Sequence, residues 1–129
     1  MKVATNRPDG WPQATTVGYV NEGLTLYFLC APQRQKAQNL ARDDRISLTI
    51  DHDTSNPMAI TGVSMAAHAE AVDETAEVAK SVKHDTAKFP EYAGFPMPKP
   101  EEIRIFRVTP TVISVLDYTK GFGHSDLVA

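Results

Sequence analysis

The feature that most constrains this sequence is a succession of short runs in which apolar and polar residues alternate, each run bounded by turn residues. Ile46, Leu48 and Ile50 show the pattern, and a period of two is typical of a strand with one buried face. Seven such runs fill most of the chain. Because Asp9-Gly10 and Asn21-Glu22-Gly23 have the composition of hairpin turns, neighbouring runs are expected to pair antiparallel.

The seven expected strands are Met1–Asn6, Gln13–Val20, Leu24–Cys30, Arg45–Asp51, Met58–Val72, Ile103–Val108 and Thr111–Asp117, the last two separated by a break at Pro110. Helical spacing occurs twice. A short helix is expected to bury Ala37, Leu40 and Ala41, and a second is expected to begin after the capping residue Asp73. Four prolines in Phe89–Pro100 predict an irregular, packed loop. The pattern predicts a mainly β, antiparallel barrel or sandwich in a single domain.

Charge and cysteine content exclude several classes of function. The 129 residues carry a net charge of −3 with both signs interspersed, so neither nucleic acid nor an acidic membrane surface is an expected partner. We find neither a long apolar run nor a signal-peptide segment, which makes a membrane association unexpected and the cytoplasm the expected compartment. The single cysteine, Cys30, excludes an internal disulfide, and its apolar neighbours predict a small buried side chain rather than a reactive thiol.

The segment between the third and fourth expected strands carries the clearest chemical signal. Gln33, Arg34 and Lys36 stand where the first helix is expected to begin. Free backbone N–H groups and the positive end of the helix dipole gather at such a position, so added cations are favourable only if an anion binds there. The sequence therefore indicates either a phosphate-binding site or two side chains that simply extend into water.

Several short motifs follow one another along nearly the whole chain. They are Pro8-Asp9-Gly10-Trp11-Pro12-Gln13 before Ala14–Tyr19, then Leu26-Tyr27-Phe28, Lys36 followed by Asn39-Leu40, Asp44–Leu48, and the closing Asp117–Gly123. In order and spacing these motifs resemble the pyridoxamine 5′-phosphate oxidase-like family. The resemblance implies an antiparallel six- to seven-stranded split β-barrel with two short helices, forming one FMN-binding domain over residues 1–129. It also implies a homodimer with FMN sites at the subunit interface.

The resemblance further implies a set of cofactor-binding residues. The phosphate is expected at Gln33, Arg34 and Lys36, with Leu29 and Cys30 beside the ribityl phosphate. The flavin ring is expected against the second strand. A second subunit is expected to contribute its long strand and its C-terminal segment, with Tyr118 and Lys120 at the mouth of the site. The remaining residues expected at the site are Thr15, Thr16, Val17, Gly18, Tyr19, Thr61 and Gly62.

Three departures from the family pattern accompany the resemblance. The sequence begins directly in a strand where relatives usually carry a helix, so we expect a truncated or helix-poor member. Gln35-Lys36 stands where the oxidase itself has Arg-Lys, which predicts a weaker hold on phosphate. The sequence ends at Ala129 without the arginine-rich stretch that binds pyridoxine phosphate, so oxidation of vitamin B6 is not expected.

Other signals are weaker. Gly121-Phe122-Gly123 opens no helix of a βαβ unit and is expected to be a turn. His52 would point away from Asp51 and Asp53 in a strand, so no metal site is predicted. His124 is the histidine we consider for haem ligation, and His68 is expected at a dimer or core edge. Two functions stay open: an FMN-dependent oxidoreductase acting on an unidentified small molecule, with no catalytic residue assigned, or a non-catalytic flavin or haem carrier or sensor.

Overall fold

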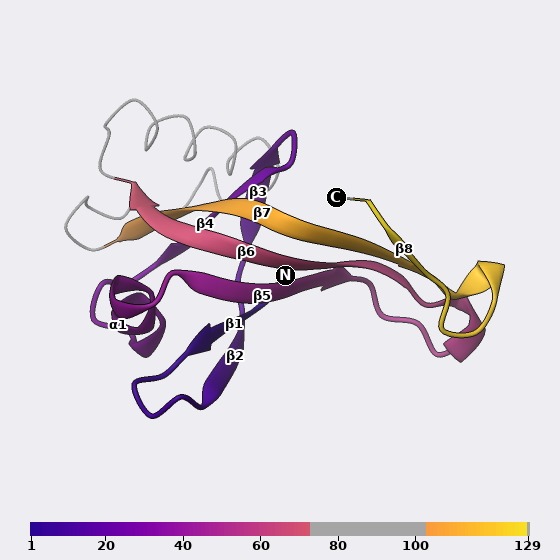
Figure 1. The fold of residues 1–129 in the computed structure, drawn as a ribbon, viewed down its shortest axis with the longest axis horizontal. Helices are drawn as coiled ribbons and strands as arrows, with labels where there is room; N and C mark the ends of the chain where they lie inside the picture. The colour runs from indigo at the N-terminus through magenta and orange to yellow at the C-terminus, as the bar shows by residue number, and fades with distance from the viewer. Residues whose placement is uncertain (73–102, 129) are drawn as a thin grey trace, which may run out of the picture.

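The computed structural model describes residues 1–72 and 103–128, whose strands form one antiparallel sheet. The strand order is β2-β1-β5-β6-β7-β4-β3, with β8 paired to β7, and the sheet curls as a half-barrel (Figure 1). The elements are β1 (Lys2–Asn6), β2 (Pro12–Thr16), β3 (Tyr19–Glu22), β4 (Thr25–Cys30), α1 (Gln35–Arg42), β5 (Arg45–Asp51), η1 (Pro57–Ala59), β6 (Thr61–Val72), β7 (Arg104–Asp117), η4 (Tyr118–Lys120) and β8 (Ser125–Leu127). The mainly β, split-barrel fold is thus confirmed, with a higher strand number than expected.

The expected strand Gln13–Val20 is two strands in the structure. β2 ends at Thr16 and pairs with β1, whereas β3 begins at Tyr19 and pairs with β4. These two strands stand at opposite ends of the sheet order, and only Val17 and Gly18 connect them. Burial alternates without interruption through this corner, so the local pattern does not reveal that the chain changes partners there.

The expected break at Pro110 is wrong, because β7 continues through it from Arg104 to Asp117. Ala67 pairs with Pro110 and Ala66 pairs with Val112, which leaves Thr111 as an extra residue in β7. A bulge of this kind accommodates proline, which has no N–H to give to the ladder. The Thr111 hydroxyl donates to the Ala66 carbonyl oxygen at 3.0 Å, so the strand keeps a connection to β6 at the bulge.

The core lies inside the curl of the sheet, where the stacked rings of Phe28 and Phe106 lie 5.3 Å apart between centroids. Ile46 and Leu48 of β5 are buried there, as the alternation predicted. Met65, Ala67 and Ala69 of β6 are buried in the same core. The alanines of β6 on this face therefore pack within their own chain, and only the opposite face of the strand is available to a second molecule.

Helix α1 covers one end of the curl but is rotated relative to the expectation. Ala37 and Leu40 are buried as predicted, whereas Ala41 is exposed and Asn39 is fully buried in its place. Residues 36, 37, 39 and 40 lie on one side of a helix with 3.6 residues per turn. Because the buried side includes position 36, Lys36 is half-buried instead of extending freely into water.

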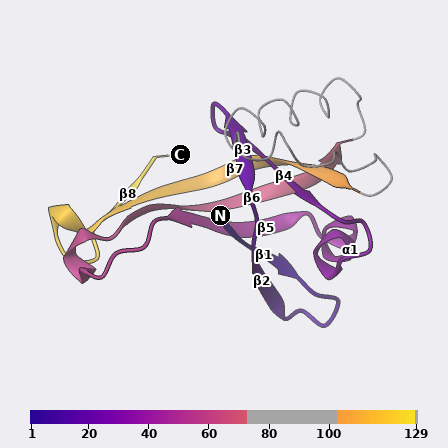
Figure 2. The ribbon, with the colours of Figure 1, turned by 180° about the vertical axis from the view of Figure 1, so that it is seen from behind.

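Figures 1 and 2 place α1 and the β1–β2 hairpin toward one end of the molecule, and the turns η1 and η4 at the other. The long strands β6 and β7 connect the two ends. No helix within residues 1–72 and 103–128 is long and apolar enough to cross a membrane. The expected second helix after Asp73 and the loop Phe89–Pro100 lie outside the described residues.

Candidate functional site

A cleft of about 570 Å³ opens where the end of β2, the end of β4 and the beginning of α1 meet. Its volume lies in the range of sites that bind small molecules and cofactors. The lining residues come from these three segments: Gln13, Thr15, Thr16, Val17, Gly18, Leu29, Cys30, Ala31, Arg34, Gln35 and Lys36. The cleft therefore unites the second strand with the strand-to-helix segment, which are remote from each other in sequence.

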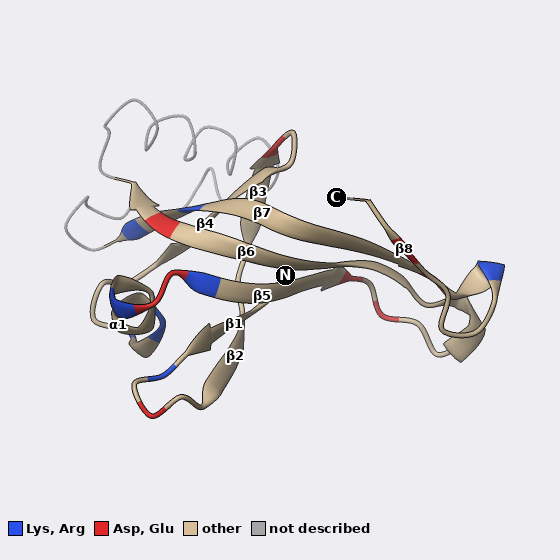
Figure 3. Cartoon of the chain, viewed as in Figure 1, with Lys and Arg blue, Asp and Glu red and all other residues tan. Residues whose placement is uncertain are grey.

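One end of the cleft is rich in hydrogen-bond donors. Arg34 is the N-cap of α1, forms no side-chain capping bond, and is followed by no acidic residue in the first turn. The N–H groups of that turn have no partner within the helix. Among the described residues, no carboxylate lies within ion-pair distance of Arg34 or Lys36. Figure 3 shows the basic segments on α1. This arrangement favours an anion.

Burial changes the acidity of two groups in the cleft. It lowers the pKa of the Lys36 ammonium, because part of the water that stabilises the charge has been removed; the Coulomb interaction with Cys30 acts in the opposite direction. Burial also raises the pKa of the Cys30 thiol, an effect that the Coulomb interactions with Lys36 and Arg104 oppose. Lys36 is thus a partly desolvated cation without a carboxylate, and Cys30 is a half-buried thiol rather than a thiolate.

One residue that lines the cleft carries a polar group without a partner within the protein. The Oγ1 atom of Thr15 is buried and makes no hydrogen bond, and it is the one buried side-chain oxygen or nitrogen of this kind among the described residues. An unsatisfied buried hydroxyl costs free energy. Because the atom is closed off from solvent, it lies behind the wall of the cleft and offers no hydrogen bond to a molecule in it.

The structure brings together eight of the residues that the sequence suggested: Thr15, Thr16, Val17, Gly18, Leu29, Cys30, Arg34 and Lys36. Gln33 is exposed just before the helix, and its carbonyl accepts a hydrogen bond from the Gln38 side chain. Tyr19 packs against the core from β3. Neither residue lines the cleft.

The other four suggested residues lie at the opposite end of the β6–β7 pair. The Tyr118 N–H donates to the Ile60 carbonyl at 2.8 Å, and Lys120 Nζ lies 3.7 Å from Asp126 Oδ2. Thr61 pairs with Asp117 in the sheet. Gly62 has a packing role there, since a Cβ at this position would lie 2.9 Å from the Ile50 carbonyl oxygen. Within one chain, these four residues therefore lie away from the cleft.

Three residues of the cleft were not among those suggested: Gln13, Ala31 and Gln35. Gln13 belongs to the alternation of β2, two residues before Thr15, so a strict reading of the period along that strand identifies it. No comparable signal identifies Gln35, since its position depends on the rotation of α1 about its axis.

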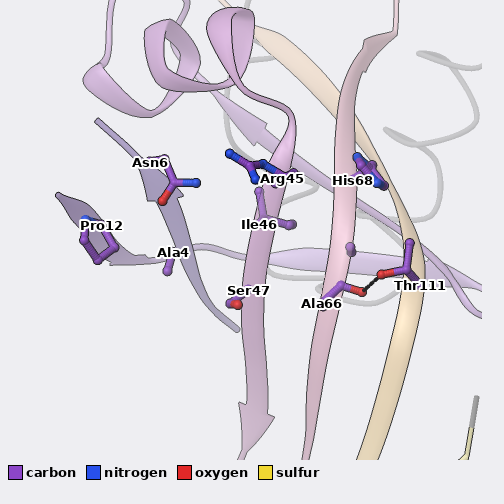
Figure 4. A pocket seen from close by; sticks show the side chains of 10 residues that line it. Ala4, Asn6, Pro12, Arg45, Ile46, Ser47, Ala66, His68 and Thr111 are labelled. Atoms are coloured by element: carbon purple, nitrogen blue, oxygen red, sulfur yellow. Dashed lines mark hydrogen bonds between the residues drawn. The ribbon is translucent and has the colours of Figure 1, made fainter. Parts of the chain in front are cut away.

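A second hollow, of about 360 Å³, lies on the outer face of the sheet (Figure 4). Four of its polar side chains, those of Asn6, Arg45, His68 and Thr111, have partners within the protein. Asn6 donates to Asp43 Oδ2 at 3.2 Å, Arg45 donates to both oxygens of the same carboxylate, and His68 Nδ1 lies 2.9 Å from Asp44 Oδ1. Since these polar groups are already paired, this hollow is the weaker candidate for a binding site.

The remaining histidine and glycine signals have local roles. His52 Nε2 lies 3.3 Å from the Thr61 hydroxyl, and His124 Nε2 lies 3.0 Å from Asp126 Oδ2. Residues 121–123 form the expected turn, in which Gly121 has φ 145° and Gly123 has φ 77°. Phe122 between them is exposed, with its ring centroid 5.6 Å from that of Tyr118.

Comparison with known proteins agrees with this description. The sequence model of the family described as pyridoxamine 5′-phosphate oxidase matches residues 1–117. The chain belongs to this family. No curated protein matches the sequence.

Solved structures with the same fold include proteins named for different ligands. A heme binding protein from Mycobacterium smegmatis has a TM-score of 0.80 and 21% identity over 99% of this chain, which spans only 51% of that protein. The heme storage protein of Vibrio cholerae has a TM-score of 0.71 and 19% identity, over 84% of this chain and 79% of that one. An F420 reductase has a TM-score of 0.64 and 25% identity, over 87% and 86%. The fold is thus shared among proteins with different ligands.

Proposed function

We propose that this member of the family binds FMN in the cleft between β2, β4 and α1. The observation that carries the proposal is the half-buried Lys36, which has no carboxylate partner among the described residues and stands in the first turn of α1. Arg34, Lys36 and the free N–H groups of that turn would hold the phosphate. Residues Thr15 to Gly18 would lie along the flavin ring.

We further propose that residues 1–129 form a single domain and that two copies form a dimer. The cleft is open in one chain, and Thr61, Gly62, Tyr118 and Lys120 lie far from it, so a second copy would have to bring them. The outer face of the sheet supports close approach, because several of the side chains around its hollows are small. They include Ala4, Ala14, Ser47, Ser64 and Ala66.

The proposed activity is that of an oxidoreductase with an unidentified small substrate, in the cytoplasm. FMN supplies the redox chemistry, while the protein binds and orients it and adjusts its potential through hydrogen bonds. This division of roles explains why the proposal needs no acid–base or nucleophilic group in the cleft. Tyr118 and Lys120 of the second copy would stand at the open edge of the flavin and contact the substrate or the electron donor.

Two measurements test this function. The visible absorption spectrum of the purified protein, followed by titration with FMN, is expected to show one FMN per chain. Stopped-flow mixing of the loaded protein with NADH and with NADPH is expected to reduce the flavin. A flavin that stays oxidised for minutes with both donors would refute the nicotinamide-linked activity and favour a flavin carrier.

The second candidate is a carrier or sensor of haem on the same fold. Two of the similar structures are named as heme binding and heme storage proteins. His124, whose Nε2 lies 3.0 Å from Asp126, is the residue that we would assign as its ligand, since a carboxylate commonly orients a ligating imidazole. This candidate would be favoured by two results together. The parent protein shows a haem absorption band and does not bind FMN, and the band is absent in His124→Ala.

A further inference from the structure

A buried polar network lies beneath the beginning of α1. Asn39, whose side chain is 0% exposed, donates to the Thr5 hydroxyl oxygen at 2.9 Å and accepts a hydrogen bond from Gln35 Nε2 at 2.8 Å. Its amide nitrogen also lies 3.5 Å from Gln13 Oε1. Burial of an amide is costly unless its groups are bonded, so these partners determine the orientation of Asn39.

The network connects three elements and reaches the cleft through two of its members. Asn39 belongs to α1, Thr5 to β1 and Gln13 to β2. Gln13 and Gln35 both line the cleft, whereas Asn39 and Thr5 are buried behind it. The side chain of Asn39 therefore holds the first turn of α1 against the strand that forms the other wall.

The contact with Asn39 determines which atoms of the Gln13 amide remain available to a ligand. Because its Oε1 faces the Asn39 amide nitrogen, its Nε2 group keeps both N–H donors for other partners. Gln35 is held in the opposite sense, because its Nε2 donates to the Asn39 oxygen. Donors from Gln13 thus join Arg34, Lys36 and the free N–H groups of α1 around one end of the cleft.

We propose that Asn39 is a positioning residue for the phosphate end of the cleft, and that Gln13, oriented by Asn39, donates a hydrogen bond to the phosphate. This inference rests on the proposed FMN site and adds two residues to it. It has a specific consequence: loss of the network weakens binding of FMN more than binding of riboflavin, which has the same ring and no phosphate.

The first test compares Asn39→Ala with Leu40→Ala, which removes a neighbouring buried side chain of α1 outside the network. Fluorescence titration with FMN and with riboflavin gives, for each variant, the ratio of the FMN affinity to the riboflavin affinity. A hydrogen bond to a charged group supports about a tenfold effect, so Asn39→Ala is expected to lower this ratio about tenfold. Leu40→Ala is expected to lower the melting temperature and leave the ratio unchanged.

The second test uses Gln13, because a substitution at this cleft residue leaves the buried side chain of Asn39 in place. Gln13→Glu keeps an acceptor for Asn39 but has no N–H donors and adds a negative charge, so it is expected to lower the ratio by more than about tenfold. Gln13→Leu is expected to lower it less. NMR titration with inorganic phosphate gives a readout without flavin: the Gln13 amide and the backbone amides of residues 35–37 are expected to shift.

The outcomes separate this inference from the proposed function. Phosphate shifts at these amides without FMN binding would refute the function and support the inference. FMN binding with an unchanged ratio in Asn39→Ala and Gln13→Glu would overturn the inference and leave the function standing. Failure of the parent protein to bind FMN and phosphate would overturn both.

Discussion

Replacement of Lys36 by alanine is the most direct test of the anion site. The side chain is half-buried in the cleft, stands in the first turn of α1 and has no carboxylate within ion-pair distance among the described residues. A charge-assisted hydrogen bond to a phosphate contributes about 1.5–3 kcal/mol, which corresponds to a loss of FMN affinity of roughly tenfold to a hundredfold.

The same substitution is expected to weaken FMN binding without lowering the stability of the ligand-free protein. Burial lowers the pKa of Lys36, so the folded state disfavours the charged form relative to the unfolded chain. Where the lysine is charged in both states it therefore opposes folding, and this cost is lost as the pH rises from the folded pKa through the unfolded pKa. Lys36→Ala is expected to melt at the same temperature as the parent protein or slightly higher.

The assays are fluorescence titration with FMN and thermal unfolding of the ligand-free protein. Arg7→Ala serves as the control, since it removes the same charge from an exposed position between β1 and β2, outside the cleft and outside the hollows of the outer face. It is expected to bind FMN as the parent protein does. An unchanged FMN affinity in Lys36→Ala would remove the phosphate assignment. A lower melting temperature together with weaker binding would indicate that Lys36 acts through the fold.

Three further predictions concern the cleft, the sheet and the dimer. Thr15→Val, which removes the unpartnered hydroxyl, is expected to stabilise the ligand-free protein by about 1 kcal/mol in urea unfolding; a loss of stability would contradict this prediction. Hydrogen bonds from Arg45 above all, and then from Asn6, lower the pKa of Asp43, so its contribution to stability is present above the unfolded pKa and is lost as the pH falls. The stability difference between the parent protein and Asp43→Asn should be constant at neutral pH and shrink as the pH falls below about 4, the pKa of an unfolded aspartate, and a difference that stays constant below about pH 4 would count against the assignment. Ala66→Arg on the outer face is expected to convert a dimer to a monomer in light scattering and to weaken FMN binding, whereas a monomeric parent protein would refute the dimer.

Local sequence was sufficient for most of the elements. Alternation predicted β5 with its bounds and its buried Ile46 and Leu48, because a period of two assigns each side chain to a face without knowledge of its neighbours. The beginning of α1 near Arg34 and Lys36 was also predicted from the sequence. Together with the spacing of the motifs, these signals identified the family that the comparison confirms.

Tertiary structure decided what depends on contacts between distant segments. The chain changes partners at Val17 and Gly18, because β2 pairs with β1 and β3 with β4. β7 continues through Pro110, because the extra residue in β7 forms a bulge at the point where proline has no N–H to donate to β6. Neither event leaves a signal in the local alternation of residues.

The same distinction applies to the cleft. The sequence identified Lys36 as a cation at a helix start, but its burial depends on how α1 rotates against the sheet. That rotation turns Asn39 inward, where Thr5 and Gln13 supply hydrogen bonds from strands more than twenty residues away in the sequence. Residue types and their period thus determined the strands and the positions of the charges. Packing of α1 on β1 and β2 decided which polar groups face the cleft, because a buried amide needs hydrogen-bond partners from distant segments.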